Sequence, residues 1–242
     1  MTKDARDEQV QLLTDGLLKT FDNAEELYNE ATYLAERGSL PRAVLLHQIS
    51  LEECGKAEML CVAIFSALQG TVIDMKQLKR AFSRHEGKNR TNAYFLPTSE
   101  EENLARTNND VEAATKAFKD IQTQFHKDSN TLKNASLYVD FDGKFVSPKD
   151  VVTRENLDEI RKRNAEFLSM MHQKLSVVQG WAKNIDATFE LQTQLLKQLG
   201  LDGLDHTNLD ERRAFADGIL AKIDELVNSI HQPSDKANPD SK

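Results

Sequence analysis

The sequence predicts an all-α protein, because turn-forming residues are scarce and helical periodicity extends over long stretches. The chain holds 10 Gly and 5 Pro among 242 residues, about 6% against roughly 12% in average proteins. Many-stranded β-folds need a turn every ~8–12 residues, so this composition argues against them. With 39% hydrophobic residues, the chain is apolar enough to bury a core.

The first two helices are expected over residues 4–37 and 41–70, where apolar residues recur at helical spacing. Gly38 separates them as a stop signal. The second half of the second helix, 57–68, is apolar almost all round. Such a helix belongs in the middle of a bundle, so we expect the second helix to be central.

Three more helices complete the predicted bundle. They are expected over residues 74–89, 98–130 and 153–199. The fourth should begin with a capping box made by Thr98 and Glu101. The fifth should be capped by Thr153 and broken near Gly180, the glycine in its interior.

A small β-hairpin is expected near residues 137–146, between the fourth and fifth helices. The segment is rich in β-formers around Asp142-Gly143, and Asp-Gly between apolar residues is a strong hairpin signal. We therefore expect a helical bundle domain over 1–199 that contains the hairpin. An amphipathic C-terminal helix over 204–231, packed on the bundle or on a partner subunit, and a disordered polar tail over 232–242 should follow.

The charge and the apolar runs limit the compartment and the partners. The net charge of −8 gives no bulk attraction to nucleic acid or anionic membrane, so any such binding must be local. The sequence has no run of ~18 apolar residues, so we expect no membrane span. The N-terminus is polar, so we expect no signal peptide. Cys54 and Cys61 lie about 10 Å apart on one expected helix, too far to bridge. A cytoplasmic protein is expected.

Charged residues interrupt the apolar face of the second helix. Glu52 and Lys56 fall on the stripe, and Glu53 lies beside them. They could form an i,i+4 ion pair at the edge of the bundle, or they could line a functional polar pocket. Gly55 in mid-helix costs ~1 kcal/mol relative to Ala, so another helix or a ligand should approach closely there.

In the third expected helix, a histidine occupies the last position of the apolar pattern. Leu78, Ala81 and Phe82 are followed by His85 at i+7, so His85 should continue the apolar face inward. Residues 74–90 carry six basic and two acidic side chains, a net +4. A histidine in such a place is either a satisfied core residue or a proton-transfer group beside an anion.

The neighbouring arginines favour chemistry on a phosphodiester. Arg80, Arg84 and Lys88 should form one row on this helix, and Arg80 precedes His85 in an Arg-x4-His arrangement. A histidine can move a proton to or from an RNA 2′-hydroxyl, and an arginine can hold the phosphate. No metal is needed when the 2′-hydroxyl is the nucleophile.

Metal and nucleotide sites find no support in the sequence. None of the six histidines has a Glu three residues before it, as ferritin-like metal bundles require. The three Gly-Lys pairs lack the first glycine of a P-loop. We expect no metal and no cofactor, and chelators should leave any activity intact.

Three short elements resemble the AbiV-type abortive-infection proteins of bacteria, which belong to the HEPN superfamily. They are Glu52-Glu53-Cys54-Gly55-Lys56-Ala57, His85-Glu-Gly-Lys88, and Leu137-Tyr-Val-Asp140 before Ser147-Pro148. The resemblance covers about 24–180. It implies an up-and-down helical bundle, usually a homodimer, in a protein that acts in phage defence by stopping translation.

The resemblance also implies an activity. Many HEPN proteins are metal-independent RNases with an Arg-x4–6-His motif, which Arg80 and His85 match. The residue after the arginine is Ala81, where the family usually has a polar residue. The RNA target would be tRNA, mRNA or rRNA. The alternative is a non-catalytic protein that binds a phage protein, an RNA or a translation component, with the hairpin as one docking element.

These arguments define a candidate pocket between the second and third helices. The catalytic candidates are Arg80, His85, Glu53 and Lys56. The substrate-binding candidates are Glu52, Arg84, Lys88 and Arg90. Either glutamate could be the one that faces the pocket.

Overall fold

The computed structural model describes residues 1–93 and 96–198. It divides the chain into two compact units, Met1–Lys183 and Asn184–Lys242. The predicted C-terminal helix and tail lie outside the described residues, and the predicted domain boundaries remain predictions. Apart from one small hairpin, the described structure is helical, so the predicted all-α fold is confirmed.

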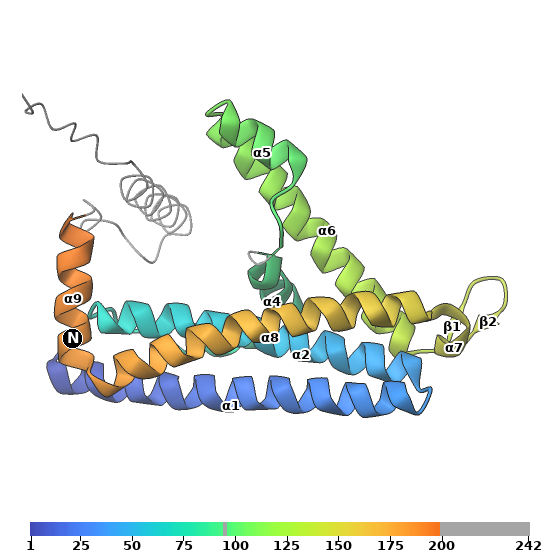
Figure 1. The fold of residues 1–242 in the computed structure, drawn as a ribbon, viewed down its shortest axis with the longest axis horizontal. Helices are drawn as coiled ribbons and strands as arrows, with labels where there is room; N and C mark the ends of the chain where they lie inside the picture. Colours follow the sequence, from blue (N-terminus) through green and yellow to red (C-terminus); the bar gives the residue numbers. More distant parts are fainter. Residues whose placement is uncertain (94–95, 199–242) are drawn as a thin grey trace, which may run out of the picture. The chain divides into compact units, whose positions relative to one another are not determined.

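Three long helices lie side by side in the first unit (Figure 1). They are α1 (Lys3–Glu36), α2 (Leu40–Leu68) and α8 (Arg154–Lys183). Gly38, with φ +75°, lies in the tight turn between the first two. Helix α2 also contacts α4 and α6, so its predicted central position is correct. The largest fully buried side chains come from all three long helices and include Phe21, Leu51, Ile64, Phe167 and Met171.

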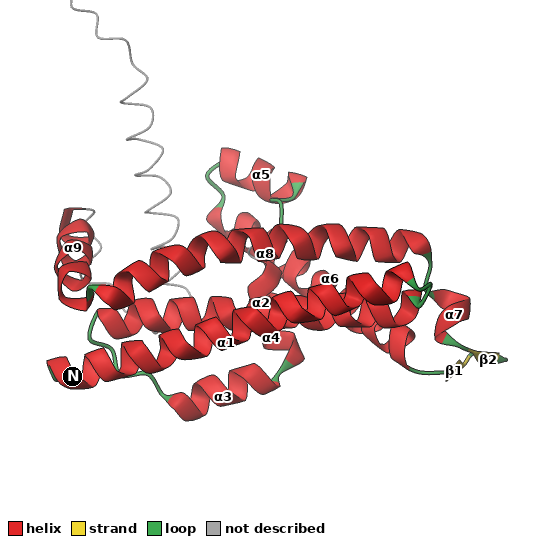
Figure 2. Ribbon diagram, turned by 60° about the horizontal axis from the view of Figure 1, so that its bottom comes forward, coloured by secondary structure: helices red, strands yellow, loops and turns green. Residues whose placement is uncertain are grey.

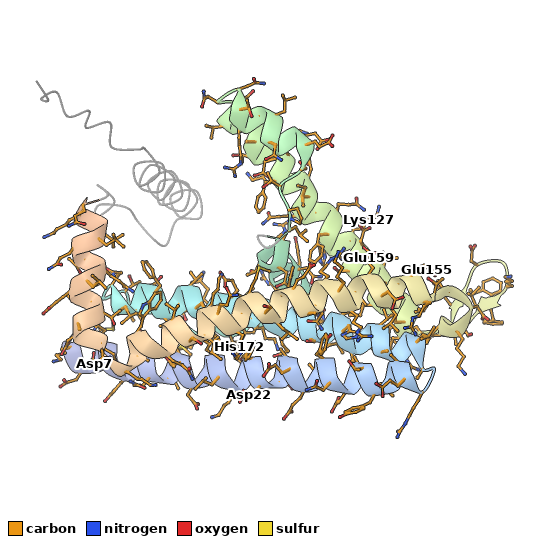
Figure 3. The ribbon with its side chains drawn as sticks, in the orientation of Figure 1. Asp7, Asp22, Lys127, Glu155, Glu159 and His172 are labelled. Atoms are coloured by element: carbon orange, nitrogen blue, oxygen red, sulfur yellow. The ribbon has the colours of Figure 1, made fainter. Side chains whose placement is uncertain are left out.

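A buried polar network connects these three helices. Asn164 Nδ2 on α8 lies 3.2 Å from His47 Nδ1 on α2. Ser50 on α2 donates to the Ala24 carbonyl oxygen of α1 and lies 3.2 Å from Asn164 Oδ1. Ring contacts add to the same packing: Phe21 of α1 meets His172 of α8, which Figure 3 labels.

The predicted third helix is wrong as a single element. The chain forms α3 (Met75–Ser83) and α4 (His85–Asn92), which Figure 2 shows as separate helices joined by a bend. Arg84 lies between them in an extended conformation, φ −97° and ψ 112°. The predicted row of Arg80, Arg84 and Lys88 on one helix therefore does not exist, and His85 does not continue the apolar face of α3.

The predicted fourth helix is also two helices, α5 (Glu100–Thr107) and α6 (Val111–Leu137). Asn109 adopts a positive φ of 56° at the break. The cap of α5 is Ser99, which accepts a hydrogen bond from the Glu102 backbone, instead of the predicted Thr98. The side chain of Asp110 caps α6 in the same way.

The predicted hairpin is present but very short. Strands β1 (Asp140–Phe141) and β2 (Phe145–Val146) pair antiparallel around Gly143, which has φ +69°. Helix α7 (Pro148–Val151) follows, and Thr153 caps α8 by exchanging hydrogen bonds with Asn156. The break after α8 falls at Asn184 instead of Gly180, before α9 (Ile185–Gln198). Within the described ranges, no helix is both long and apolar enough to cross a membrane.

Candidate functional site

The side chain of Glu52 is the centre of a charged cluster inside the helical bundle. It is almost fully buried on α2. Its Oε2 lies 2.7 Å from His85 Nδ1 and accepts a hydrogen bond from Lys88 Nζ at 2.6 Å. Its Oε1 accepts one from Lys133 Nζ at 3.0 Å. We call these four residues the Glu52 cluster; α2, α4 and α6 each contribute to it.

The cluster keeps Glu52 ionised despite its burial. Burial is the largest single influence and acts to raise the pKa of Glu52. Hydrogen bonds from Lys88, Lys133 and His85, together with the charge of Lys88, outweigh it and hold this pKa below its ordinary value. One carboxylate thus faces two lysine ammonium groups, so the cluster carries excess positive charge.

His85 is the exposed member of the Glu52 cluster. It is the first residue of α4, and 56% of its side chain is exposed, while the side chains of Glu52 and Lys88 are only 4% and 6% exposed. An ionised carboxylate only accepts hydrogen bonds, so the proton of this contact belongs to His85 Nδ1. Within the described residues, the other ring nitrogen, Nε2, has no hydrogen-bond partner. A fixed imidazole with a free Nε2 is the arrangement of a general base.

Gly55 allows α4 to approach α2 closely enough to form the cluster. A Cβ at this position would lie 2.7 Å from the Lys88 carbonyl oxygen and 3.1 Å from Asn92 Oδ1. Asn92 Nδ2 donates to the Leu51 carbonyl oxygen at 2.6 Å across the same contact. The predicted close approach at Gly55 is therefore correct, and the approaching element is a helix.

Replacing Gly55 with alanine should displace α4. The added Cβ meets backbone, which cannot rotate away, and overpacking of this kind costs about 1–3 kcal/mol, more than the gain in helix propensity. Gly16→Ala is the matched control, because its Cβ would lie 3.8 Å from a Leu60 methyl carbon, an ordinary contact. Gly16→Ala should raise the free energy of unfolding by about 0.5–1 kcal/mol. Urea denaturation measures both, and equal stabilities would contradict the close approach.

In the described structure, no hydrogen bond or ion pair joins Glu52 to the remaining predicted site residues, which are Glu53, Lys56, Arg80, Arg84 and Arg90. Glu53 pairs with Lys56 one turn along α2, so the predicted Glu52–Lys56 pair is not formed. Arg90 forms an exposed i,i+4 pair with Glu86. Arg80 and Arg84 are exposed, and neither side chain has a hydrogen-bond or ion-pair partner within the described part of the chain. Lys88 donates its hydrogen bond to Glu52 and so belongs to the Glu52 cluster.

Sequence reasoning missed Lys133, the second lysine that holds Glu52. A pattern could have found it, because Phe125 and Ser129 precede it at i−8 and i−4 and both are buried. Lys133 thus continues an inward-facing stripe of α6. Asn89 and His126, whose side chains meet at 3.3 Å, were missed as well.

The two cysteines are inert in this fold. Cys54 and Cys61 are both buried. Neither forms a disulfide, which agrees with their predicted separation. Burial, with the nearby carboxylates Glu53 and Glu58 respectively, raises the pKa of each thiol to about 12. A thiol that stays protonated is a poor nucleophile, so neither cysteine is a candidate catalyst.

The described fold is a helical bundle with a buried Glu/Lys/His cluster formed by α2, α4 and α6. The sequence model of the family described as AbiV, a HEPN family, matches residues 12–169, a range that contains every member of the Glu52 cluster. The chain belongs to the AbiV family of abortive-infection HEPN proteins.

The chain is also similar to a curated protein. The uncharacterized protein y4gJ of Sinorhizobium fredii (strain NBRC 101917 / NGR234) is 39% identical over 112 residues. The match covers 46% of this chain and 58% of the relative, so the chain spans little more than half of that protein. No solved structure matches the chain.

Proposed function

We propose that this protein is a phage-defence protein of the cytoplasm that cleaves RNA without a metal ion and so stops translation. The observation that carries the proposal is the exposed imidazole of His85, fixed through Nδ1 by a carboxylate that two buried lysines keep ionised. The substrate would be tRNA, mRNA or rRNA, and the protein would act as a homodimer.

In this proposal His85 is the general base and Glu52 positions it. His85 Nε2 takes the proton of a ribose 2′-hydroxyl, which then attacks the adjacent phosphate. Glu52 holds the ring and stabilises the imidazolium that forms. Lys88 and Lys133 form ion pairs with Glu52. In this proposal the groups that bind the phosphate are therefore Arg84, next to His85, and Arg80 at the end of α3.

Replacing His85 with alanine should abolish RNA cleavage by the purified protein, because the proton acceptor is lost. The expected loss is about 10²–10⁴-fold. The measurement is the appearance of tRNA or total-RNA fragments with time, in the presence and absence of a chelator. His172→Ala is the matched control, since His172 is an exposed histidine of α8. Cleavage that persists in His85→Ala contradicts the proposal.

A non-catalytic binding function is the second candidate, and the hairpin favours it. The rings of Phe141 and Phe145 stack edge to face at 5.2 Å, yet these side chains are 64% and 80% exposed. Tyr138 and Val139 beside them are exposed too. Exposed aromatic residues of this kind suit a protein partner such as a phage protein. Growth arrest that survives His85→Ala without RNA fragments would favour this function.

A further inference from the structure

A second histidine lies on the same seam between α4 and α6 as the Glu52 cluster. The Nδ2 atom of Asn89 on α4 lies 3.3 Å from Nδ1 of His126 on α6. Asn89 follows His85 by four residues, and His126 precedes Lys133 by seven. Residues four or seven apart share a helix face, so both pairs face the same seam.

Three contacts place the two histidines in order along this seam. His85 and Lys133 meet through Glu52, then Asn89 meets His126, and finally Gln122 Nε2 donates to the Arg90 carbonyl oxygen at 3.1 Å. Residue numbers rise along α4 as they fall along α6, so the helices run antiparallel here. Along the axis of α4, His85 and Asn89, the residue that contacts His126, are about 6 Å apart, because a helix rises ~1.5 Å per residue.

We propose that His126 is a second proton-transfer group of this site, positioned by Asn89 and acting with His85 on one RNA phosphodiester. This inference rests on the proposed function. It assigns the proton donor that the reaction needs.

The Asn89 amide is suited to hold His126 in both protonation states. Asn89 is 1% exposed, and its Oδ1 is a buried atom without a hydrogen-bond partner in the described structure. The neutral tautomer of His126 that carries its proton on Nε2 accepts from Asn89 Nδ2 at Nδ1. When Nδ1 carries a proton, a half-turn of the amide presents Oδ1 to it. The unpartnered oxygen thus gains a partner in the protonated state.

The proposed step balances in protons and bonds. His85 Nε2 takes the 2′-hydroxyl proton as the 2′-oxygen forms a bond to phosphorus. The bond from phosphorus to the 5′-oxygen breaks, and protonated His126 gives its Nε2 proton to that oxygen. The products are a 2′,3′-cyclic phosphate and a 5′-hydroxyl. His126 is left neutral, with Nδ1–H donating to Asn89 Oδ1.

Charged residues close in the chain to His126, or close to its contact with Asn89, come from three helices. Lys127 is its neighbour on α6, and Lys133 lies two turns further. On α4 the Glu86–Arg90 ion pair is adjacent to Asn89. On α8 the Arg163 guanidinium lies 5.4 Å from the centre of the Phe125 ring, next to His126 in the chain. Three of these cations are paired with carboxylates: Arg163 with Glu159, Arg90 with Glu86 and Lys133 with Glu52.

Two substrates with different leaving groups test the role of His126. The first is a uridylyl dinucleotide, whose leaving 5′-oxygen must be protonated. The second is uridine 3′-(p-nitrophenyl phosphate), whose leaving group departs as a stable anion and needs no proton. His126→Gln should lose about 10²-fold or more on the dinucleotide and little on the nitrophenyl ester. His85→Ala should lose equally on both, because the attack needs its base in each case.

Matched variants separate proton transfer from folding. Asn89→Leu should reproduce the leaving-group dependence of His126→Gln in weaker form. His172→Gln should match the wild type on both substrates. An equal loss by His126→Gln on both substrates would mean a structural role and overturn the inference, as would an unchanged rate on the dinucleotide. A wild type that cleaves neither of these substrates and yields no fragments from tRNA or total RNA overturns the proposed function itself.

Discussion

Glu52→Gln should lower the free energy of unfolding by about 3–5 kcal/mol. The substitution leaves two nearly buried ammonium groups, those of Lys88 and Lys133, without a countercharge. Glutamine keeps one acceptor oxygen, but its amide nitrogen is a donor that faces another donor. The loss therefore reflects uncompensated buried charge more than the loss of a single hydrogen bond.

Glu53→Gln is the matched control for this prediction. Glu53 is the next residue on the same helix. Among the described residues it pairs with a single lysine, Lys56, whose side chain is 23% exposed. This variant should cost clearly less than Glu52→Gln. Urea denaturation at neutral pH measures both. Equal losses for the neighbouring glutamates would mean that the Glu52 cluster adds no stability of its own.

Adding Lys88→Met or Lys133→Met to Glu52→Gln tests whether unpaired buried charge causes the loss of stability. Each removes one of the ammonium groups that Glu52→Gln leaves unpaired. A double variant should therefore be more stable than Glu52→Gln alone, although it lacks one more native contact. The comparison separates the effect of charge from the effect of packing.

The sequence showed that Glu52 is unusual but could not show its partners. A charged residue on the apolar face of a central helix is visible from helical periodicity alone. The side chains that hold it come from residues 33, 36 and 81 positions further along the chain. Only the packing of α4 and α6 against α2 brings them together. The local alternative, an i,i+4 pair with Lys56, was the one that spacing could suggest, and it is not formed.

Helix existence was predictable from periodicity, and helix breaks were less so. Gly38 and the Asp142-Gly143 turn are marked by residues that favour them, and the structure has turns at both. The break at Arg84 has no Gly or Pro to mark it, and the side chains on either side keep helical spacing. That unmarked break matters for function. It separates Arg80 from His85 and makes His85 the first residue of a helix docked through Gly55.

The stability of the bundle should fall as the pH drops from about 6.5 to about 4, because His47 cannot take up a proton in the folded state. Burial, and next the charge of Arg161, lowers the pKa of His47 from 6.5 to about 4. His47 is fully buried and faces the amide nitrogen of Asn164, a donor that a protonated ring would repel.

The direction of the change follows from proton uptake. Between pH 6.5 and 4 the unfolded chain binds a proton at His47 and the folded protein does not, so unfolding is favoured as the pH falls. The total is on the order of 3 kcal/mol at pH 4. Glu52 acts in a lower range: its pKa is lowered in the folded state, so its contribution is lost only as the pH falls through that lowered value.

Urea denaturation between pH 7 and 5 isolates the effect of His47, because most carboxylates stay ionised over this range. The free energy of unfolding should decrease with falling pH in the wild type and decrease less in His47→Gln, which has no titrating ring. His172→Gln, at an exposed position of α8, should keep the slope of the wild type. If His47→Gln and His172→Gln show the same slope, His47 is protonated in the folded protein and the buried network with Asn164 tolerates its charge.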